Sequence, residues 1–245
     1  MKTVAIIQAR TGSTRLPRKV LQDLGGSTVL ARVIDRVQRF SLIHDLIVAT
    51  STHDSDDAVV EECARARVET FRGNEADVLD RFVGAANYTN ADVCVRLTAD
   101  CPLLDAGVSD SIISLFLEAD GAVDYASNKI PQSFPRGLDT EVFSRDALDK
   151  AAREAHQQYE RVHVTAYMYK HPERFNLLSV TSDVDRAEWR WTVDTAEDLE
   201  FVREIYRRLD SDGNFSWTDV VALLEDEPEL MWINSHVQQK AIEAG

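Results

Sequence analysis

The 245-residue sequence contains little cysteine and no long apolar run. Its three cysteines, Cys63, Cys94 and Cys101, are an odd number without CxxC spacing, which fits neither a disulfide framework nor a zinc site, so we expect buried thiols. No apolar run approaches the roughly 18 to 20 residues that span a bilayer, and the N-terminus lacks a signal-peptide pattern. We therefore expect a soluble, cytoplasmic protein that acts without a membrane partner.

Positive charge is also scarce, because 27 Lys and Arg face 42 Asp and Glu for a net charge of −15. A field of this sign repels polyanions, which excludes general binding to nucleic acid. Residues 1–40 nevertheless hold eight basic and two acidic side chains, a local charge of +6 that leaves −21 for the rest of the chain. This partition indicates a compact anionic ligand bound by the N-terminal segment. Arg32, Arg36 and Arg39 are the exception, since their spacing favours the solvated face of a helix.

Short apolar runs alternate with segments of helical periodicity in the first half of the chain. The pattern predicts strands at residues 3–8, 45–51, 68–72, 92–98 and 123–127. It predicts helices over about residues 27–40, 54–67, 75–88 and 106–118, the last one N-capped by Asp105. Alternation of this kind implies a parallel sheet with helices on both faces.

The second half of the chain is less regular. After a polar loop at 128–137, we expect strands at 140–143, 176–181 and 191–193 and helices at 146–155 and 160–169. Thr195 and Asp198 match a capping box that opens a helix ending near residue 209, and a last helix covers about 217–224. No internal repeat or Pro/Gly/Ser-rich linker divides the chain, so one α/β domain with a smaller lobe is the simplest prediction.

The densest chemical signal is the loop QARTGSTRLPRKVL, residues 8–21, directly after the first strand. Ligands of open α/β sheets bind beyond the carboxyl ends of strands, where this loop is expected to lie. Its glycine, its hydroxyl groups and four cationic side chains (Arg10, Arg15, Arg18 and Lys19) supply what an oligophosphate needs. Neither GxxxxGK[ST] nor GxGxxG is present, which removes the usual support for a kinase or a dehydrogenase. The alternative is an ordinary surface turn.

Two aspartates follow predicted strands at the same rim of the sheet. Asp100 ends the stretch VRLTAD, and Asp194 ends RWTVD. Two carboxylates near a phosphate-binding loop are a typical Mg²⁺ set, since magnesium takes one or two carboxylates plus phosphate oxygens and water. The alternative for Asp194 is that it only assists the cap of the following helix.

Taken together, these motifs resemble one family. The stretches QARTGSTRLPRKVL, FRGNEADVLDRF, VRLTADCPLLD, DYASN, FPRGLDTEVF, ERVHVT and RWTVDTAEDLEFV occur in family order from residue 8 to about 202, and INSHVQQK also looks familial. The chain resembles the cytidylyltransferases that make CMP-activated sugars, most closely the spore coat polysaccharide biosynthesis protein F branch. The resemblance implies a Rossmann-like three-layer fold related to nucleotide-diphospho-sugar transferases, CTP as donor, Mg²⁺ as cofactor and a homodimer.

The same resemblance implies roles for individual residues. The catalytic set would be Arg10 and Lys19 on the triphosphate with Asp100 and Asp194 as metal ligands. The nucleotide site would comprise Ala9, Arg10, Thr11, Gly12, Ser13, Arg15, Lys19, Arg72, Asp77, Arg81 and Thr98, with Arg72, Asp77 and Arg81 near the base and ribose. The acceptor pocket would comprise Asn128, Arg136, Asp139, Glu141 and His163. Arg136 suits an acidic acceptor, because a guanidinium grips a carboxylate bidentately. Each of two residues has an equally open alternative role. Arg136 could be a turn residue that pairs with Asp139, and His163 could be a polar residue on a helix without a part in binding.

The sequence departs from the family pattern at four positions. Arg18 and Ala99 stand where glycine is common, Val162 where an acidic residue is common, and Ala166 where proline is frequent. The change at Arg18 adds a charge near the phosphates but gives up backbone freedom. The changes at Val162 and Ala166 leave the identity of the acceptor substrate undetermined, but they do not affect the predicted type of reaction.

The prediction is therefore in-line transfer of CMP from CTP to a hydroxyl of an acidic sugar, with release of pyrophosphate, in surface polysaccharide or glycoconjugate biosynthesis. Residues 1–127 would form the nucleotide-binding half, 128–182 an acceptor and dimerisation lobe, and 183–245 the return to the core. The acceptor could be a nonulosonate, an octulosonate, another sugar acid or a phosphonate. The alternatives are a glycosyltransferase using Asp183 and Asp185 as a DxD pair, and a nucleotide-sensing protein without turnover.

Overall fold

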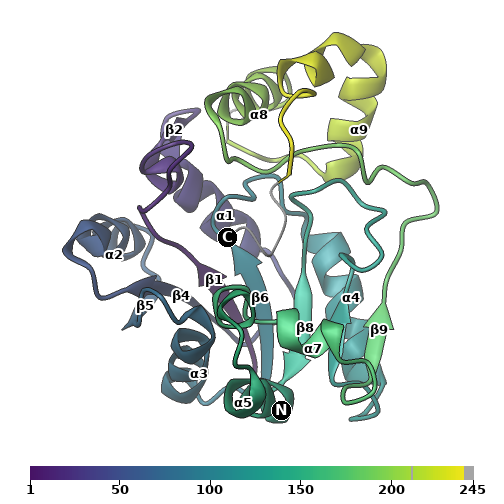
Figure 1. Ribbon diagram of the computed structural model, residues 1–245. Coiled ribbons are helices and arrows are strands. Elements are labelled where there is room, and N and C mark those ends of the chain that lie inside the picture. Colours follow the sequence, from purple (N-terminus) through teal and green to yellow (C-terminus); the bar gives the residue numbers. More distant parts are fainter. Residues whose placement is uncertain (211, 240–245) are drawn as a thin grey trace.

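A seven-stranded sheet runs through the middle of the molecule in the computed structural model, which describes residues 1–210 and 212–239 (Figure 1). The strand order is β5-β4-β1-β6-β8-β7-β9. These strands are β1 (Thr3–Gln8), β4 (Asp45–Ser51), β5 (Glu69–Gly73), β6 (Val93–Thr98), β7 (Tyr125–Ser127), β8 (Glu141–Ser144) and β9 (Leu177–Ser179). Strands β2 (Asp23–Leu24) and β3 (Ser27–Thr28) form a separate antiparallel pair.

The sheet is mostly parallel, as the sequence predicts. Strand β1 pairs in parallel with β4 and β6, and β4 pairs in parallel with β5. Along β1, Ala5 and Ile7 enter one apolar core while Val4 and Ile6 enter the other, because successive side chains point to opposite faces. Burial on both faces explains why this strand is a continuous apolar run. Strand β8 reverses the direction, since it pairs antiparallel with β6 and β7.

Helices cover both faces of the sheet and complete three layers, which confirms the predicted fold class. They are α1 (Val29–Val37), α2 (Asp57–Arg65), α3 (Val78–Thr89), α4 (Ala106–Glu118), α5 (Arg145–Glu154), α6 (Gln158–Val162), α7 (Ala166–Lys170), α8 (Ala196–Arg208) and α9 (Trp217–Asp226). The 3₁₀ turns are η1 (Lys19–Leu21), η2 (Asp54–Asp56) and η3 (Pro228–Ile233). Residues of α1, α4, α8 and α9 share one core, and residues of α3, α5 and α7 share the other. In Figure 1, α8 and α9 lie at the top while α3 and α5 lie at the bottom.

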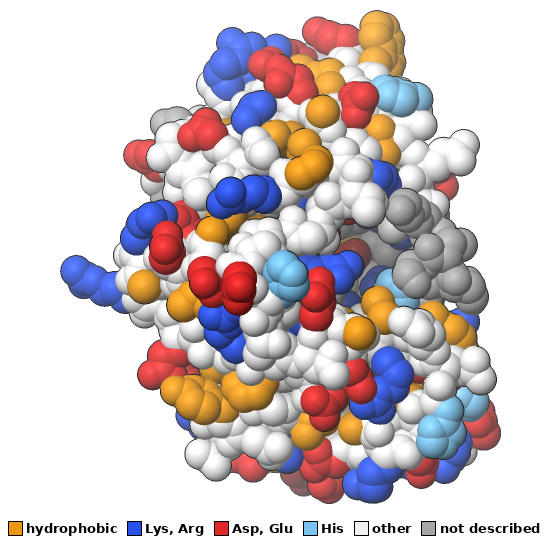
Figure 2. Space-filling view, turned by 60° about the vertical axis from the view of Figure 1, so that its left-hand side comes forward, with side chains coloured by type: hydrophobic (Ala, Val, Ile, Leu, Met, Phe, Trp, Pro, Cys, Tyr) orange, Lys and Arg blue, Asp and Glu red, His pale blue; other side chains and the backbone are white. Residues whose placement is uncertain are grey.

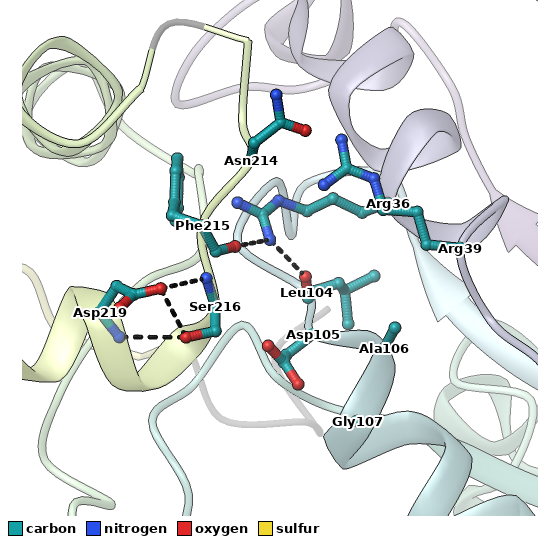
Figure 3. A pocket seen from close by; sticks show the side chains of 10 residues that line it. All are labelled: Arg36, Arg39, Leu104, Asp105, Ala106, Gly107, Asn214, Phe215, Ser216 and Asp219. Carbon is teal, nitrogen blue, oxygen red and sulfur yellow. Dashed lines mark hydrogen bonds between the residues drawn. The ribbon is translucent and has the colours of Figure 1, made fainter.

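The predicted capping residues are confirmed. Thr195 Oγ1 accepts from the Asp198 N–H at 3.3 Å at the start of α8, and Asp198 completes the capping box. Asp105 caps two helices, because Oδ1 accepts from the Val108 N–H of α4 and Oδ2 from the Trp217 N–H of α9, each at 3.0 Å. This shared cap joins the start of α9 to the start of α4, beside a cavity of about 370 Å³ (Figure 3).

The prediction that three arginines form the solvated face of α1 is wrong for two of them. Arg32 and Arg36 are buried, and only Arg39 is exposed. Arg32 donates to the carbonyl oxygens of Leu24 and Gly25, at 3.1 and 2.5 Å. Arg36 donates to the carbonyl oxygens of Leu104 and Phe215 at 3.0 and 3.2 Å (Figure 3). These arginines satisfy loop carbonyls that burial would otherwise leave without donors.

Two predicted elements differ in the structure. The expected helix at 160–169 is split into α6 and α7, because Val164 takes a left-handed conformation with φ of 58° and Thr165 Oγ1 donates to Glu141 Oε1 at 2.5 Å. The expected strand at 191–193 does not form. Its N–H groups go to two different segments, Trp191 to the Arg136 carbonyl and Val193 to the Asp100 carbonyl, each at 2.7 Å, so no continuous ladder can develop.

All three cysteines are buried and free, as expected. Among the residues described, no helix combines the length and the apolar character needed to cross a bilayer.

Candidate active site

The loop after β1 is anchored to the protein through Thr11. Its N–H and its Oγ1 both donate to Asp56 Oδ1 at 2.7 Å, and Ser51 Oγ donates to Asp56 Oδ2 at 2.5 Å. Burial alone would raise the pKa of Asp56, but the hydrogen bonds from Ser51 and Thr11 hold it below 3.8. The loop ends at Arg18, which has a φ of 54°, and the chain then enters η1 with Lys19.

A cavity of about 450 Å³ opens beyond the carboxyl ends of β1 and β6. Its wall is formed by the loop after β1, the ends of β1 and β6, the segment 128–141, the end of α6, and residues from the C-terminal part of the chain (Thr192, Asp194 and Gln239). The lining side chains include Gln8, Arg10, Gly12, Ser13, Arg15, Lys19, Arg96, Thr98, Asp100, Cys101, Lys129, Arg136, Asp139, Glu141, Val162, His163, Asp194 and Gln239. Figure 2 shows a hollow in the surface with Lys or Arg side chains gathered around it.

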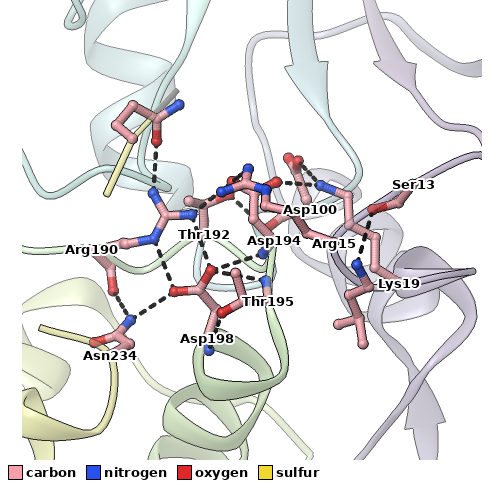
Figure 4. Close-up of polar contacts among 12 residues, drawn as sticks. Ser13, Arg15, Lys19, Asp100, Arg190, Thr192, Asp194, Thr195, Asp198 and Asn234 are labelled. Carbon is pink, nitrogen blue, oxygen red and sulfur yellow. Dashed lines mark hydrogen bonds and ion pairs between the residues drawn. The ribbon is translucent and has the colours of Figure 1, made fainter. Parts of the chain in front are cut away.

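Lys19 and the two predicted metal ligands form one cluster in this cavity (Figure 4). Lys19 Nζ lies 2.6 Å from Asp100 Oδ2 and 2.6 Å from Asp194 Oδ1. Burial would lower the pKa of Lys19, but the two carboxylates more than offset it and raise the pKa above its ordinary value. Burial would likewise raise the pKa of Asp100, yet Lys19 lowers it to about 2. The cluster is therefore ionised at neutral pH.

Asp194 is held in place by arginines on its second oxygen. Its Oδ2 lies 2.9 Å from Arg15 Nη2 and 2.7 Å from Arg190 Nη2. Arg190 in turn forms a two-point pair with Asp198, which is 0% exposed. Asn234 Nδ2 donates to Asp198 Oδ1 at 3.0 Å, so the C-terminal segment buttresses the same pair (Figure 4).

The opposite side of the cavity is built around Glu141. Its carboxylate pairs with Arg96 of the central strand β6, and it accepts from Tyr125 Oη at 2.8 Å and from Thr165 Oγ1 at 2.5 Å. Burial would raise the pKa of Glu141, but Lys129 and Arg96 lower it to about 2. Glu141 is thus a fixed anion that orients cationic side chains at the cavity wall.

Two cationic side chains that line the cavity, those of Arg10 and Arg136, stand apart from the ion pairs described above. Within residues 1–210 and 212–239, the side chains of Arg10 and Arg136 make no hydrogen bond or ion pair. Asp139 lies beside Arg136 and accepts one hydrogen bond, from Gln132 Nε2 at 3.1 Å. These two guanidinium groups at the cavity wall can bind an anionic ligand.

The structure brings most of the predicted site residues together and places the others apart. The cavity contains the predicted Arg10, Gly12, Ser13, Arg15, Lys19, Thr98, Asp100, Arg136, Asp139, Glu141, His163 and Asp194. Ala9 and Thr11 are buried beneath the loop. Asn128 is buried as well, with Nδ2 donating to the Leu138 carbonyl at 2.8 Å and Oδ1 accepting from the Thr140 N–H at 2.9 Å. Its side chain supports the 138–140 segment and does not line the cavity.

The three residues predicted near the base and ribose also lie outside the cavity lining. Arg72 Nη1 pairs with Asp57 Oδ1 at 2.6 Å. Asp77 caps α3 and pairs with Arg161 Nη2 at 2.5 Å. Arg81 is buried, and its Nε and Nη2 have no hydrogen-bond partner in the part of the chain that the structure describes. Burial, reinforced by the charge of Arg10, lowers the pKa of Arg81 to about 10. The assignment of Arg72, Asp77 and Arg81 to the nucleotide stays a prediction.

Sequence reasoning missed Arg96, Lys129, Arg190 and Asp198. Arg96 carries a readable signal, because an arginine inside an apolar strand requires a buried anion. Arg190 and Asp198 flank Asp194 at i−4 and i+4, but their pairing depends on a turn that the sequence does not specify. Asp183 and Asp185, the possible DxD pair, are exposed and do not line the cavity.

The fold and the site define a class of protein: a nucleotidyltransferase with a Rossmann-like sheet, a cationic loop after β1 and paired carboxylates at the carboxyl edge. Comparison with known proteins narrows the class. The protein-family model described as Cytidylyltransferase matches residues 4–225 of this chain. The chain therefore belongs to the cytidylyltransferase family.

Similar proteins agree with this family. The spore coat polysaccharide biosynthesis protein SpsF of Bacillus subtilis is 32% identical over 231 residues, which cover 91% of this chain and 94% of that protein. The structure of a cytidylyltransferase from Leptospira borgpetersenii superimposes with a TM-score of 0.91 at 32% identity, covering 98% of this chain and 99% of that one. A CMP:2-keto-3-deoxy-manno-octonic acid synthetase complexed with CTP shares the fold, with a TM-score of 0.68 at 18% identity over 85% of this chain and 99% of that one.

Proposed function

We propose that this enzyme is a Mg²⁺-dependent cytidylyltransferase that transfers CMP from CTP to a hydroxyl of an acidic sugar. The observation that carries the proposal is the convergence of Asp100, Asp194 and Lys19 in a cavity that is also lined by Arg10 and Arg136. The acidic sugar in the name of one neighbour of this fold, and the polysaccharide pathway in the name of SpsF, support the acceptor class.

The nucleotide side of the proposal rests on the loop after β1. Arg10, Arg15 and Lys19 would contact the triphosphate, with the hydroxyl of Ser13 and the exposed main chain at Gly12 beside them. Charge that gathers on departing pyrophosphate is stabilised by these fixed cations, which is the main form of catalysis in phosphoryl transfer. Thr11 does not line the cavity, and it would act by holding the loop in this position through Asp56.

Asp100 and Asp194 would hold Mg²⁺. The donor set fits a small hard cation, because two carboxylate oxygens already lie within 2.6 Å of one ammonium nitrogen. When bound, the metal supplies Lewis-acid stabilisation of the phosphate oxygens. Arg190 and Arg15 keep Asp194 ionised and oriented for this purpose.

The acceptor side is formed by Arg136, Lys129 and Arg96, with Asp139 and His163 on the same wall. A carboxylate of the acceptor would pair with Arg136, which is free to bind it. Asp139 has one oxygen without a hydrogen bond among the described residues, and this oxygen can accept from an acceptor hydroxyl. Holding both reactants in one cavity lets the hydroxyl approach the α-phosphate in line.

A pyrophosphate-release assay tests the proposal. CTP, UTP, ATP and GTP are each incubated with a panel of nonulosonates, octulosonates, neutral sugars and phosphonates in the presence of Mg²⁺. We expect release only with CTP and an acidic sugar, and loss of nearly all release in Asp100→Asn. Release that needs no acidic sugar, or wild-type-like turnover by Asp100→Asn with Mg²⁺, would count against it.

The remaining expectations belong to the same proposal. We infer that the enzyme is a cytoplasmic homodimer, that its 245 residues act as one domain, and that it has no nucleic-acid or membrane partner. Light scattering of the purified protein gives the oligomeric state, and a single cooperative unfolding transition supports one domain.

A further inference from the structure

Lys19 occupies the place between the two carboxylates that would hold the metal. One nitrogen atom contacts Asp100 Oδ2 and Asp194 Oδ1 at the same distance, 2.6 Å. Mg²⁺ binds carboxylate oxygens at about 2.0 to 2.1 Å, so an ion that reached both oxygens would occupy nearly the same point. The ammonium group and the metal therefore exclude one another.

The other carboxylate oxygens offer no alternative place. Asp194 Oδ2 is engaged by Arg15 and Arg190, at 2.9 and 2.7 Å. Asp100 Oδ1 faces the buried thiol of Cys101, whose Sγ lies 3.6 Å away. Asp194 Oδ2 is held by two arginines at once, whereas the movement of one side chain, Lys19, would free both Asp100 Oδ2 and Asp194 Oδ1.

Local charge decides when Lys19 can leave. The carboxylates of Asp100, Asp194 and Asp198 are balanced by Lys19, Arg15 and Arg190, so the cluster is neutral. Adding a divalent cation alone would leave this partly buried cluster with two excess positive charges. A metal–triphosphate complex carries about two net negative charges, and its phosphates offer the displaced ammonium a new partner.

We propose that Lys19 is a built-in substitute for the metal, which yields the carboxylates only when the metal arrives together with the triphosphate. The free enzyme then binds divalent cations weakly, and nucleotide and metal bind as one unit. This inference rests on the proposed metal site and adds an order of binding to it. When the metal replaces Lys19 at the two carboxylates, this exchange also moves the Lys19 ammonium group onto the phosphates, where its charge stabilises the departing pyrophosphate.

Mn²⁺ binding provides the test, because the electron paramagnetic resonance signal of free Mn²⁺ reports binding without turnover. Wild type, Lys19→Met and Lys19→Gln are titrated with Mn²⁺ in the absence and presence of α,β-methylene-CTP. Arg18→Met is the matched control. The sequence places Arg18 among the loop cations expected to serve the phosphates, but in the structure its side chain is exposed and does not line the cavity. The Gln variant retains an amide donor for one carboxylate, and it serves if the Met variant does not fold.

Without nucleotide, we expect both Lys19 variants to bind Mn²⁺ about tenfold or more tightly than wild type, and Arg18→Met to match wild type. The nucleotide analogue should tighten Mn²⁺ binding by wild type more than by the Lys19 variants. Equal Mn²⁺ affinity of the Lys19 variants and Arg18→Met would overturn the exchange while leaving the metal site intact. Absence of Mn²⁺ binding by every variant, even with the analogue, would overturn the metal site itself and the exchange with it.

Discussion

Arg190 and Asp198 form a buried two-point ion pair four residues on either side of Asp194. Arg190 Nε lies 2.9 Å from Asp198 Oδ1 and Nη2 lies 3.0 Å from Oδ2. The same Asp198 Oδ2 accepts from the N–H groups of Asp194 and Thr195 at 3.0 and 3.1 Å. One carboxylate thus caps α8, fixes the main chain of Asp194 and holds the arginine that orients the side chain of Asp194.

Replacement of Asp198 by Ala should therefore cost both stability and activity. Loss of Asp198 leaves the buried Arg190 with Asp194 as its remaining carboxylate partner among the described residues and removes the acceptor of two main-chain N–H groups, so we expect unfolding to become easier by about 3 kcal/mol. Urea unfolding followed by circular dichroism measures this change. Glu200→Ala, on an exposed position of the same helix, should change stability by no more than about 0.5 kcal/mol. Similar effects of the two substitutions would contradict the assigned role.

Arg18→Gly should stabilise the protein. Arg18 has a φ of 54°, where a side chain is strained and glycine is not, and its own side chain is exposed and makes no hydrogen bond or ion pair among the described residues. We expect a gain of about 0.5 to 1 kcal/mol in the free energy of unfolding, with the KM for CTP unchanged. Arg18→Ala removes the same charge but keeps the strain, so a gain in that variant would point to charge instead.

Asp139→Asn should raise stability at neutral pH and weaken the acceptor site. Burial raises the pKa of Asp139 above 3.8, although Lys129 opposes the shift. The unfolded chain then releases this proton at lower pH than the folded protein, so Asp139 destabilises the fold increasingly as pH rises from 3.8 through the raised pKa.

Urea midpoints of wild type and Asp139→Asn should consequently diverge as the pH rises above 3.8, with the variant more stable at the higher pH. The acceptor KM should rise in the same variant while the KM for CTP stays near wild type. Asp183→Asn, in an exposed loop, is the control and should show neither effect. Parallel pH curves for wild type and Asp139→Asn would refute the prediction.

Asp56→Ala should loosen the loop that carries Arg10 and Lys19. The substitution leaves the buried Thr11 N–H and the Ser51 hydroxyl without their acceptor and leaves the Thr11 hydroxyl only Ser55 Oγ, at a cost of about 2 to 3 kcal/mol. The KM for CTP should increase several-fold. Steady-state kinetics and urea unfolding measure the two effects, and the exposed neighbour Asp54→Ala should show neither. An unchanged KM for CTP would mean that this anchor does not position the loop.

The regular part of the fold could be predicted from the sequence because its signals are local. Strand β1 and helix α4 were bounded correctly, since an apolar run between polar loops and the Asp105 cap each mark an element without reference to its neighbours. The break at Val164 could not be predicted in this way. It depends on the hydrogen bond from Thr165 to Glu141, whose partner lies 24 residues away.

The candidate site was predictable in its residue types but not in its pairings. The end of β6 supplied the position of Asp100, and the loop composition supplied Lys19 and Arg15. Asp194 was placed at the same rim by an expected strand at 191–193 that does not form, although its side chain does reach the cavity. That these residues pair with one another is a long-range fact, as Lys19 and Asp194 are 175 residues apart. The buried Arg32 and Arg36 show the same limit, because periodicity placed them on a helix face that the C-terminal helices cover.

The main chain at Arg136 lies directly against the segment that leads to Asp194. Arg136 N–H donates to the Trp189 carbonyl at 2.9 Å, and Trp191 N–H donates to the Arg136 carbonyl at 2.7 Å. Gly137, with φ of 113°, follows so closely that a Cβ atom there would lie 2.8 Å from the Trp191 carbonyl carbon. Any change of loop length here would displace Asp194 as well. Engineers who wish to redirect this enzyme to another acceptor should therefore keep the backbone and exchange side chains at Lys129, Arg136 and Val162.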